Sequence, residues 1–285
     1  SPKPTDSAPQ FDRSAALSTA YATVVSLIDR LDRGLLRHDD VLDWGIPVAV
    51  FGDLHASRIA SLGINPSNRE FVDQLGIELR EPTRRFPTLR SLGIESWSEV
   101  DSRHLNLILD SYRAYFRSNP YDGWFRRLDA VIAGTGASYY CAFDSACHLD
   151  LVPFATEHKW SNLTSEQQSS LLRASGDTLA LLLRDSPVRV LVLNGSSVVR
   201  EFQRVARVCL DAEPMPEWSL PRTGSRDVPG VAFSGVVDSI SGIELNHDLL
   251  ILGFNHNLQS SFGVTKAAVA AIRDWVAQST REFTE

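Results

Sequence analysis

One stretch of sequence decides the fold class: Val188-Arg189-Val190-Leu191-Val192-Leu193-Asn194-Gly195. Its apolar residues follow one another with little polar alternation, which is typical of a strand covered on both faces, as in a parallel sheet. A similar segment at 148–152 ends at Pro153. Segments with helical spacing separate the strands along the chain. The sequence therefore predicts an α/β protein whose central, mainly parallel sheet is flanked by helices.

The other segments predict the order of elements around this sheet. Apolar residues recur at helical spacing over 12–36, which predicts an N-terminal helical extension. Residues 47–51 and 58–62 are expected to form a hairpin, and residues 211–229, with four prolines, a long loop. Two further strands are expected at 231–238 and 249–253, and further helices at about 101–118, 122–132, 164–184, 195–209 and 263–278.

The expected organisation is one domain over residues 11–285. Extra helical material at about 68–130 is expected to be an insertion into this domain. Residues 1–10 are polar and rich in proline, so we expect a disordered tail or a cloning remnant there.

Composition limits the possible functions. The 285 residues carry a net charge of −7. Three cysteines without a Cys-x-x-Cys pair exclude a disulfide framework and a four-thiolate metal or iron–sulfur site. The apolar runs are too short to cross a membrane. The negative charge argues against a protein that coats nucleic acid indiscriminately. We expect a cytoplasmic monomer without membrane association.

Three polar motifs follow apolar strands. The first is Gly63-Ile64-Asn65-Pro66-Ser67, and the second is Asp150 within 148–154. The third is Asn255-His256-Asn257-Leu258-Gln259-Ser260-Ser261. Working residues of an α/β sheet lie at the carboxyl ends of its strands, so we expect the three motifs to share one cleft.

At these motifs the sequence resembles the uracil-DNA glycosylase superfamily. The first motif looks like the family's GQDPY or GINPG, and 256–261 falls where the family has HPSPxS. The strand around Asp150 looks like the one that contacts the flipped base, and 190–195 is similar to the strand ending in Trp-Gly. The resemblance covers about 47–277. It implies a glycosylase that acts on DNA with water, without a metal or an organic cofactor.

The resemblance also implies roles for single residues. Asn65 would orient the attacking water, and His256 would donate to O2 of the base. Because Asn65 cannot take a proton, a slow enzyme or a good leaving group is expected. Other implied contacts are to the base from Ile64, Ser67 and either Phe71 or Phe86, and to DNA from Asn257, Leu258, Gln259 and Ser260. Independently of the resemblance, Arg84, Arg85 and Arg90 of the extra helical material are expected to hold phosphates or a sugar. We assign no role to His148 or His158.

Two departures from the family's pattern indicate the substrate. Asp150 stands where the family usually has Asn, and a carboxylate accepts from the N4 amino group of cytosine. Ser67 stands where the uracil-specific branch has Tyr, and it leaves the space at C5 of the base open. Together they predict a cytosine modified at C5, such as a glucosylated hydroxymethylcytosine of phage DNA, and a role in defence against phage.

Three alternatives stay open. One is a repair glycosylase for uracil or damaged bases. A second is a module that binds modified DNA without turnover. The third is a metallophosphoesterase, suggested by Gly52-Asp53-Leu54-His55 but lacking that class's second Asp and its Asn-His segment. Taken alone, the first motif is also compatible with an ordinary turn, and Asp150 with a structural cap.

Overall fold

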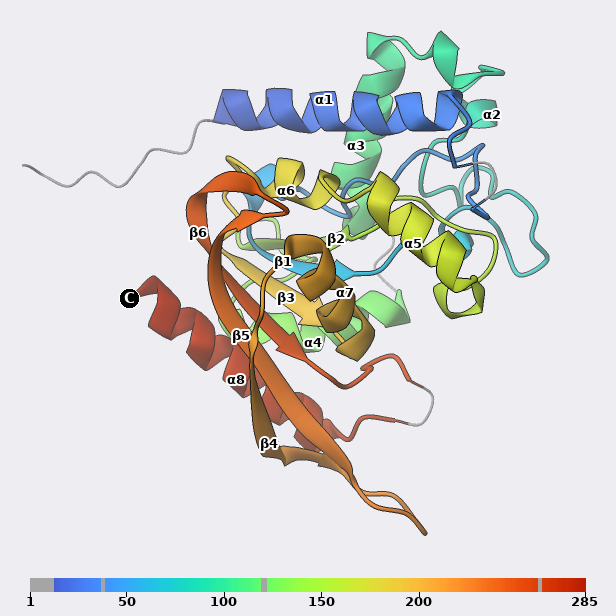
Figure 1. Cartoon of the computed structure of the whole chain (residues 1–285). Coiled ribbons are helices and arrows are strands. Elements are labelled where there is room, and N and C mark those ends of the chain that lie inside the picture. The colour runs from blue at the N-terminus through green and yellow to red at the C-terminus, as the bar shows by residue number, and fades with distance from the viewer. Residues whose placement is uncertain (1–12, 37–38, 119–121, 261–262) are drawn as a thin grey trace, which may run out of the picture.

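The computed structural model describes residues 13–36, 39–118, 122–260 and 263–285, so the tail expected at 1–10 lies outside it. Figure 1 shows a central sheet between helices, with α1 (Arg13–Asp32) running across one end of the molecule. The predicted α/β class with a mainly parallel sheet is confirmed.

The sheet in the described residues has six strands in the order β2-β1-β3-β6-β5-β4. Its parallel part consists of β1 (Ser57–Gly63), β2 (Ser145–Asp150), β3 (Val190–Asn194) and β6 (Ile243–Phe254). Two antiparallel strands extend it, β5 (Val228–Ile240) and β4 (Asp211–Leu220). Residues 190–193 are almost fully buried, as the uninterrupted apolar run predicts.

The structure corrects the long loop expected at 211–229, because its first half is the strand β4. β4 is the last strand of the sheet and pairs only with β5. An edge strand has one row of backbone groups without a ladder partner, so it tolerates Pro214 and Pro216. Prolines therefore mark the edge of this sheet rather than the absence of a strand.

The hairpin expected from 47–51 and 58–62 is also wrong. β1 pairs in parallel with β2 and β3, and no strand is assigned at 47–51. Instead, this segment runs antiparallel along the free edge of β2, where Phe51 and His148 exchange two backbone hydrogen bonds of 2.9 Å. Phe51 is thereby held beside the end of the sheet that carries the first two motifs.

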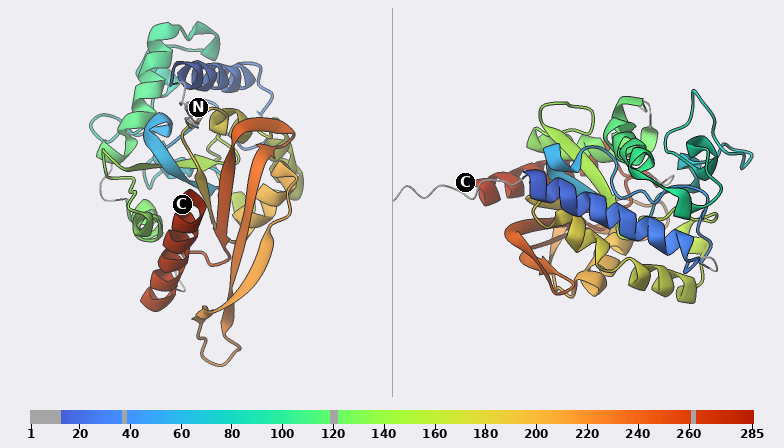
Figure 2. Two further views of the ribbon diagram at one scale, coloured as in Figure 1. Left: turned by 90° about the vertical axis from the view of Figure 1, so that its left-hand side faces the viewer. Right: turned by 90° about the horizontal axis from the view of Figure 1, so that it is seen from above.

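Helices cover both faces of the sheet (Figure 2). On one face α4 (Gly123–Ile132) packs on α8 (Lys266–Thr284), which also contacts β4 and β6. On the other face lie α6 (Thr178–Leu183) and α7 (Ser196–Ala206). The remaining helical elements are α2 (Leu89–Leu92), α3 (Ser102–Ser118), α5 (Ser165–Ala174), η1 (Leu54–Ala56), η2 (Asn68–Glu70), η3 (Trp97–Glu99), η4 (Ala133–Thr135) and η5 (Trp160–Asn162).

The helix expected at 164–184 is divided into α5 and α6, and its predicted start is confirmed by the capping box of Thr164 and Gln167. The material between β1 and β2 contains α3 and α4, and α1 packs on α3 and α6. In the part of the chain that the structure describes, no helix is both long and apolar enough to span a membrane.

An aromatic cluster joins the inserted helices to β2. Phe116 of α3 stacks on Tyr139 at a centroid distance of 4.6 Å and meets Phe125 of α4 edge-on at 4.9 Å. Phe51 meets Tyr115 edge-on, also at 4.9 Å. All five rings are buried, so the cluster forms a rigid wall behind the carboxyl end of β2.

Candidate functional site

A cavity of about 520 Å³ opens at the carboxyl ends of β1 and β2. Its lining comes from the loop after β1, from β2 and the loop after it, and from the start of α4. The residues are Phe51, Gly63, Ile64, Asn65, Pro66, Ser67, Asn68, Arg69, Glu70, Arg85, Asp122, Gly123, Trp124, Phe125, His148, Asp150, Thr156, His158, Lys159 and Trp160. The structure thus brings the first two predicted motifs together at one end of the sheet.

The pairing of β1 with β2 positions the two motifs. Gly63 and Asp150 are partners at the last step of the parallel register, and Leu151 donates its backbone N–H to the Gly63 carbonyl at 3.0 Å. Because Gly63 has no side chain, the Asp150 carboxylate occupies the space beside it. The chain then leaves β1 and reaches Asn65 two residues later.

The amide group of Asn65 has a defined orientation. Its nitrogen lies 3.2 Å from the Phe154 carbonyl oxygen and 3.1 Å from Oγ1 of Thr156. Thr156 donates its own hydroxyl hydrogen to the His158 carbonyl, so both groups accept from Asn65. With both amide hydrogens engaged, only the Oδ1 atom of Asn65 is left to bind a ligand or a water.

Asp150 is the buried acid of the cavity. It is 5% exposed, and its Oδ1 atom lies 3.1 Å from Nε2 of His148. Its other oxygen, Oδ2, is buried without a hydrogen-bond partner among the described residues. An unpaired buried carboxylate oxygen is costly, so it marks a place where a hydrogen-bond donor from a ligand or water is needed.

The aromatic residues at the cavity differ from those predicted. Phe51, Trp124, Phe125 and Trp160 line it, whereas Phe71 and Phe86 do not. Phe71 packs on Trp44 and Phe86, and Phe86 stacks on Tyr115 at 5.3 Å. Phe71 and Phe86, which were predicted to contact a base, are instead buried in the aromatic core.

One wall of the cavity is an ionic cluster. Arg85 Nη1 lies 2.8 Å from Glu70 Oε2 and 3.4 Å from Asp122 Oδ2, and Tyr115 donates its hydroxyl hydrogen to Glu70. Burial raises the pKa of Glu70, and the Arg85 guanidinium opposes that shift. Asp122 also accepts from the backbone N–H groups of Trp124 and Phe125 at the start of α4.

Of the arginines predicted to hold phosphate, Arg84 and Arg85 are not suited to that role in this arrangement. The charge of Arg85 is matched by Glu70 and Asp122. Arg84 lies outside the cavity lining and forms ion pairs with Glu78 and Glu81. These contacts make the two arginines part of the inserted segment's structure.

Two cations at the rim were missed by the sequence analysis. Arg69 and Lys159 are exposed, line the cavity and form no ion pair within the described part of the chain. Arg69 follows Asn65 by only four residues, so its proximity to the first motif could have identified it as a site residue from the sequence. Lys159 lies in the loop after β2, whose path was not predictable from its sequence.

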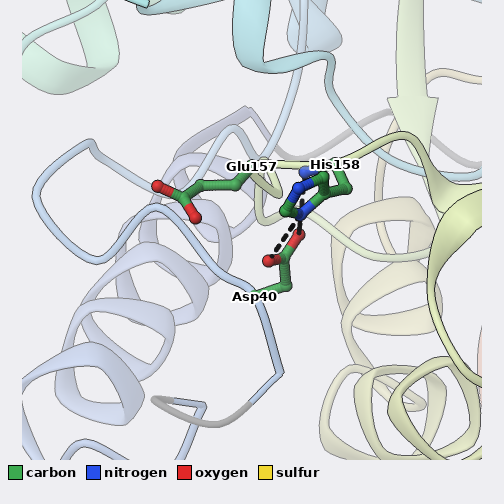
Figure 3. A group of neighbouring side chains, drawn as sticks. All are labelled: Asp40, Glu157 and His158. Carbon is green, nitrogen blue, oxygen red and sulfur yellow. Dashed lines mark hydrogen bonds and ion pairs between the residues drawn. The ribbon is translucent and has the colours of Figure 1, made fainter.

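His158, also at the rim, belongs to a small polar group with Asp40 and Glu157 (Figure 3). One ligand atom from each residue lies within 4.8 Å of the others, a spacing that a metal ion could use. However, both oxygens of Asp40 already accept from His158, one from its backbone N–H at 2.8 Å. Asp40 raises the pKa of His158, and the pair anchors the loop after β2.

The structure does not bring His256 into the cavity. Its Nε2 atom lies 2.6 Å from the carbonyl oxygen of Trp218 on β4, and the side chain is 4% exposed. The predicted donation from His256 to a base is therefore not supported, because that nitrogen already has an acceptor in the core. Ile64 and Ser67, in contrast, line the cavity.

The rest of the third motif lies beside the cavity wall. Gln259 accepts from Asn194 at 3.2 Å and donates to the Trp124 carbonyl at 3.1 Å. Asn257 is exposed and Ser260 half-buried, while Leu258 is buried, which leaves it unable to wedge into a duplex in this conformation. The final residue of the motif, Ser261, is outside the described residues.

The residues expected of a metallophosphoesterase are not brought together. Asp53 precedes β1 and caps η1, so it lies toward the amino end of the parallel strands. Asn255 and His256 follow β6 and lie at the opposite, carboxyl end. The one potential metal-binding group in the described residues contains none of these three.

Comparison with models of known protein families gives no match, and comparison with curated proteins finds no similar sequence.

Proposed function

We propose that this protein is a DNA glycosylase that hydrolyses the N-glycosidic bond of a cytosine modified at C5, after the nucleotide has flipped into the cavity. One observation carries the proposal: Asn65, in the loop after β1, and Asp150, at the end of β2, line the same cavity, and Oδ2 of Asp150 is buried without a hydrogen-bond partner among the described residues. The resemblance of these motifs to the uracil-DNA glycosylase superfamily supports it. A role in defence against phage is part of the proposal.

The dimensions and walls of the cavity suit a flipped base. A volume of about 520 Å³ falls in the range of small-molecule sites and leaves room for a substituent beside a pyrimidine. The partly exposed rings of Trp124 and Trp160 line the cavity and offer flat apolar surfaces of the kind that stack on extruded bases. Ser67 has a small side chain at the rim, which leaves space for a group at C5.

Recognition depends on Asp150. When ionised, its Oδ2 atom accepts a hydrogen bond and cannot donate one. Cytosine offers an N4 amino group as donor, whereas uracil offers an O4 carbonyl that would repel the carboxylate. Oδ2 also has no other partner in the described structure, so the amino group would satisfy a buried atom that is otherwise unpaired.

The proposed reaction uses Asn65 to position water. The bond between C1′ and N1 of the base breaks, and its electron pair leaves with the base. The Oδ1 atom of Asn65 accepts one hydrogen of a water whose oxygen adds to the cationic C1′. The other hydrogen of that water leaves as a proton and balances the charge on the departing base. Because Asn65 cannot take this proton, turnover is slow unless the base is a good leaving group.

Arg69 and Lys159 are the proposed phosphate contacts. Both are exposed at the cavity rim without an acidic partner among the described residues. Two local cations on a chain of net charge −7 suit a protein that binds DNA at one place rather than along its whole surface.

Release of bases from defined oligonucleotides tests the function. Duplex and single-stranded DNA would carry uracil, cytosine, 5-hydroxymethylcytosine or its glucosylated form at one position, and free bases would be measured by mass spectrometry. We expect release of a 5-modified cytosine, and loss of release with retained DNA binding in Asn65→Ala. Asn68→Ala is the matched control, since Asn68 also donates to the loop after β2, at 2.9 Å to the Glu157 carbonyl. Unchanged activity in Asn65→Ala would remove this residue from the mechanism.

A module that binds modified DNA without turnover is the second candidate. It is favoured by the hydrogen bond of His256 to Trp218, which leaves the departing base without the donor expected at this position. Tight binding of the modified oligonucleotide without any release of base would support this module over the enzyme. Preferential release of uracil would instead support the repair glycosylase.

A further inference from the structure

A chain of hydrogen bonds leads from the cavity into the core. Nε2 of His148 lies 3.1 Å from Oδ1 of Asp150, and Nδ1 of His148 lies 2.7 Å from Oγ of Ser61. Ser61 is also hydrogen-bonded to the hydroxyl group of Tyr139. All four residues are at most 5% exposed, so the chain is shielded from solvent.

The hydroxyl of Tyr139 fixes the direction of this chain. Within the described residues its one hydrogen-bond partner is Ser61, so Tyr139 must donate to Ser61 to use its hydrogen. Burial raises the pKa of Tyr139 well above its usual value, which keeps this hydrogen in place. Ser61 then accepts from Tyr139 and donates its own hydrogen to Nδ1 of His148.

The same direction continues to Asp150. A histidine that accepts at Nδ1 carries its hydrogen on Nε2 when neutral, and Nε2–H donates to Oδ1 of Asp150. If Asp150 carried a proton and donated it to His148, every hydrogen bond would reverse. The hydroxyl hydrogen of Tyr139 would then be buried without an acceptor, which is unfavourable.

Aromatic rings hold the imidazole of His148 in place. Phe51, Trp124 and Phe125 surround it edge-on, with centroid distances of 5.6, 5.4 and 5.2 Å. His148 therefore has one preferred orientation, and the hydrogen bonds at its two ring nitrogens give it one preferred tautomer.

We propose that this hydrogen-bond chain fixes Oδ1 of Asp150 as an acceptor, and that His148 is the positioning residue that transmits the direction of the chain. Oδ1 is committed to His148, and Oδ2 has no hydrogen-bond partner among the described residues. When Oδ2 accepts a hydrogen bond, the site selects a base with an exocyclic amino group against one with a carbonyl at the same position. This preference rests on the proposed function, whereas the tautomer of His148 does not.

Nitrogen-15 NMR on protein labelled at histidine tests the chain directly. We expect His148 to be neutral, with a hydrogen on Nε2 and none on Nδ1, and His148→Gln assigns its signals among those of the seven histidines. A hydrogen on Nδ1, in the other tautomer or in an imidazolium, would overturn the proposal. The measurement uses the unaltered protein and needs no substrate.

Tyr139→Phe tests the link to specificity. It keeps the ring on Phe116 but removes the hydroxyl, so both tautomers of His148 become accessible. The probes are oligonucleotides with 5-hydroxymethylcytosine or 5-hydroxymethyluracil, which differ at position 4 of the base. We expect mixed tautomer signals and a fall of about tenfold in the ratio of kcat/KM for the two oligonucleotides.

Tyr140→Phe is the matched control, because the hydroxyl of Tyr140 is buried without a hydrogen-bond partner in the described structure. Equal NMR spectra and equal ratios for the two variants would contradict the proposal. If the unaltered protein has the expected tautomer but releases neither base, the hydrogen-bond chain stands and the glycosylase function fails.

Discussion

Gly63 and Asp150 are partners at the ends of β1 and β2, and a Cβ atom on Gly63 would lie only 2.6 Å from Oδ1 of Asp150. The same atom would lie 3.0 Å from Nε2 of His148. Two atoms this close must move apart, so the absence of a side chain at position 63 is a condition for the hydrogen bond between His148 and Asp150.

Gly63→Ala is therefore expected to displace the carboxylate. Overpacking of a buried site costs about 1–3 kcal/mol, so the variant should fold with a lowered melting temperature. Base release should fall by about tenfold or more, a loss of at least about 1.4 kcal/mol in the activation free energy. Thermal unfolding and the base-release assay measure the two effects.

The matched control for this substitution is Gly176→Ala. A Cβ atom there would make an ordinary contact of 3.4 Å with the Leu172 carbonyl oxygen. Neither Gly176 nor Leu172 lines the cavity. If Gly63→Ala retains full activity, the carboxylate position described above is not required for the reaction.

The sequence predicted the meeting of the first two motifs for a physical reason. Strands with uninterrupted apolar runs are covered on both faces and pair in parallel, so their carboxyl ends lie at the same edge. Asn65 and Asp150 were therefore expected to lie close together, and the structure brings both to one cavity. Period-two alternation also puts His148 and Asp150 on one face of β2, a relation that the sequence analysis left unused.

The parts that the sequence could not predict depend on contacts between distant segments. The segment of β4 contains prolines typical of a loop, and only its place at the sheet edge makes a strand possible. His256 was misplaced for the same reason, because its acceptor is the carbonyl of Trp218 on β4. Phe51 lines the cavity, whereas Phe71 and Phe86 do not. This difference depends on how α3 and α4 pack, and the spacing of apolar residues in the sequence does not determine that packing.

Asp150→Asn is expected to shift the preference toward uracil-like bases. Nε2–H of His148 would still donate to the side-chain oxygen, so the amide nitrogen would take the place of Oδ2 and donate to O4 of the base. We expect the ratio of kcat/KM for 5-hydroxymethyluracil over 5-hydroxymethylcytosine to rise by about tenfold or more. An unchanged ratio would mean that Asp150 does not contact the base.

Arg69→Ala and Lys159→Ala should each weaken DNA binding without changing base preference. Each variant should reduce the slope of log K against log salt concentration by about one, as expected for one lost phosphate contact. Fluorescence anisotropy with a labelled oligonucleotide at several salt concentrations measures this. Arg33→Ala, which removes an exposed arginine paired with Asp29 on α1, is the control for net charge and should leave the slope unchanged. Equal slopes in all three variants would place the DNA elsewhere.

The pair of His158 and Asp40 predicts a pH dependence of stability. Hydrogen bonding and attraction by Asp40, together with the charge of Glu157, raise the pKa of His158 above its usual value. A histidine whose folded pKa is raised stabilises the protein fully below its unfolded pKa, about 6.5, and loses this contribution as pH rises through the folded pKa. His158→Gln should therefore lower the melting temperature at pH 5.5 and have little effect at pH 8.5. Because the side chain is exposed, added salt should reduce the difference at pH 5.5. A destabilisation of equal size at both pH values would show that loop packing, and not the charge of His158, is responsible.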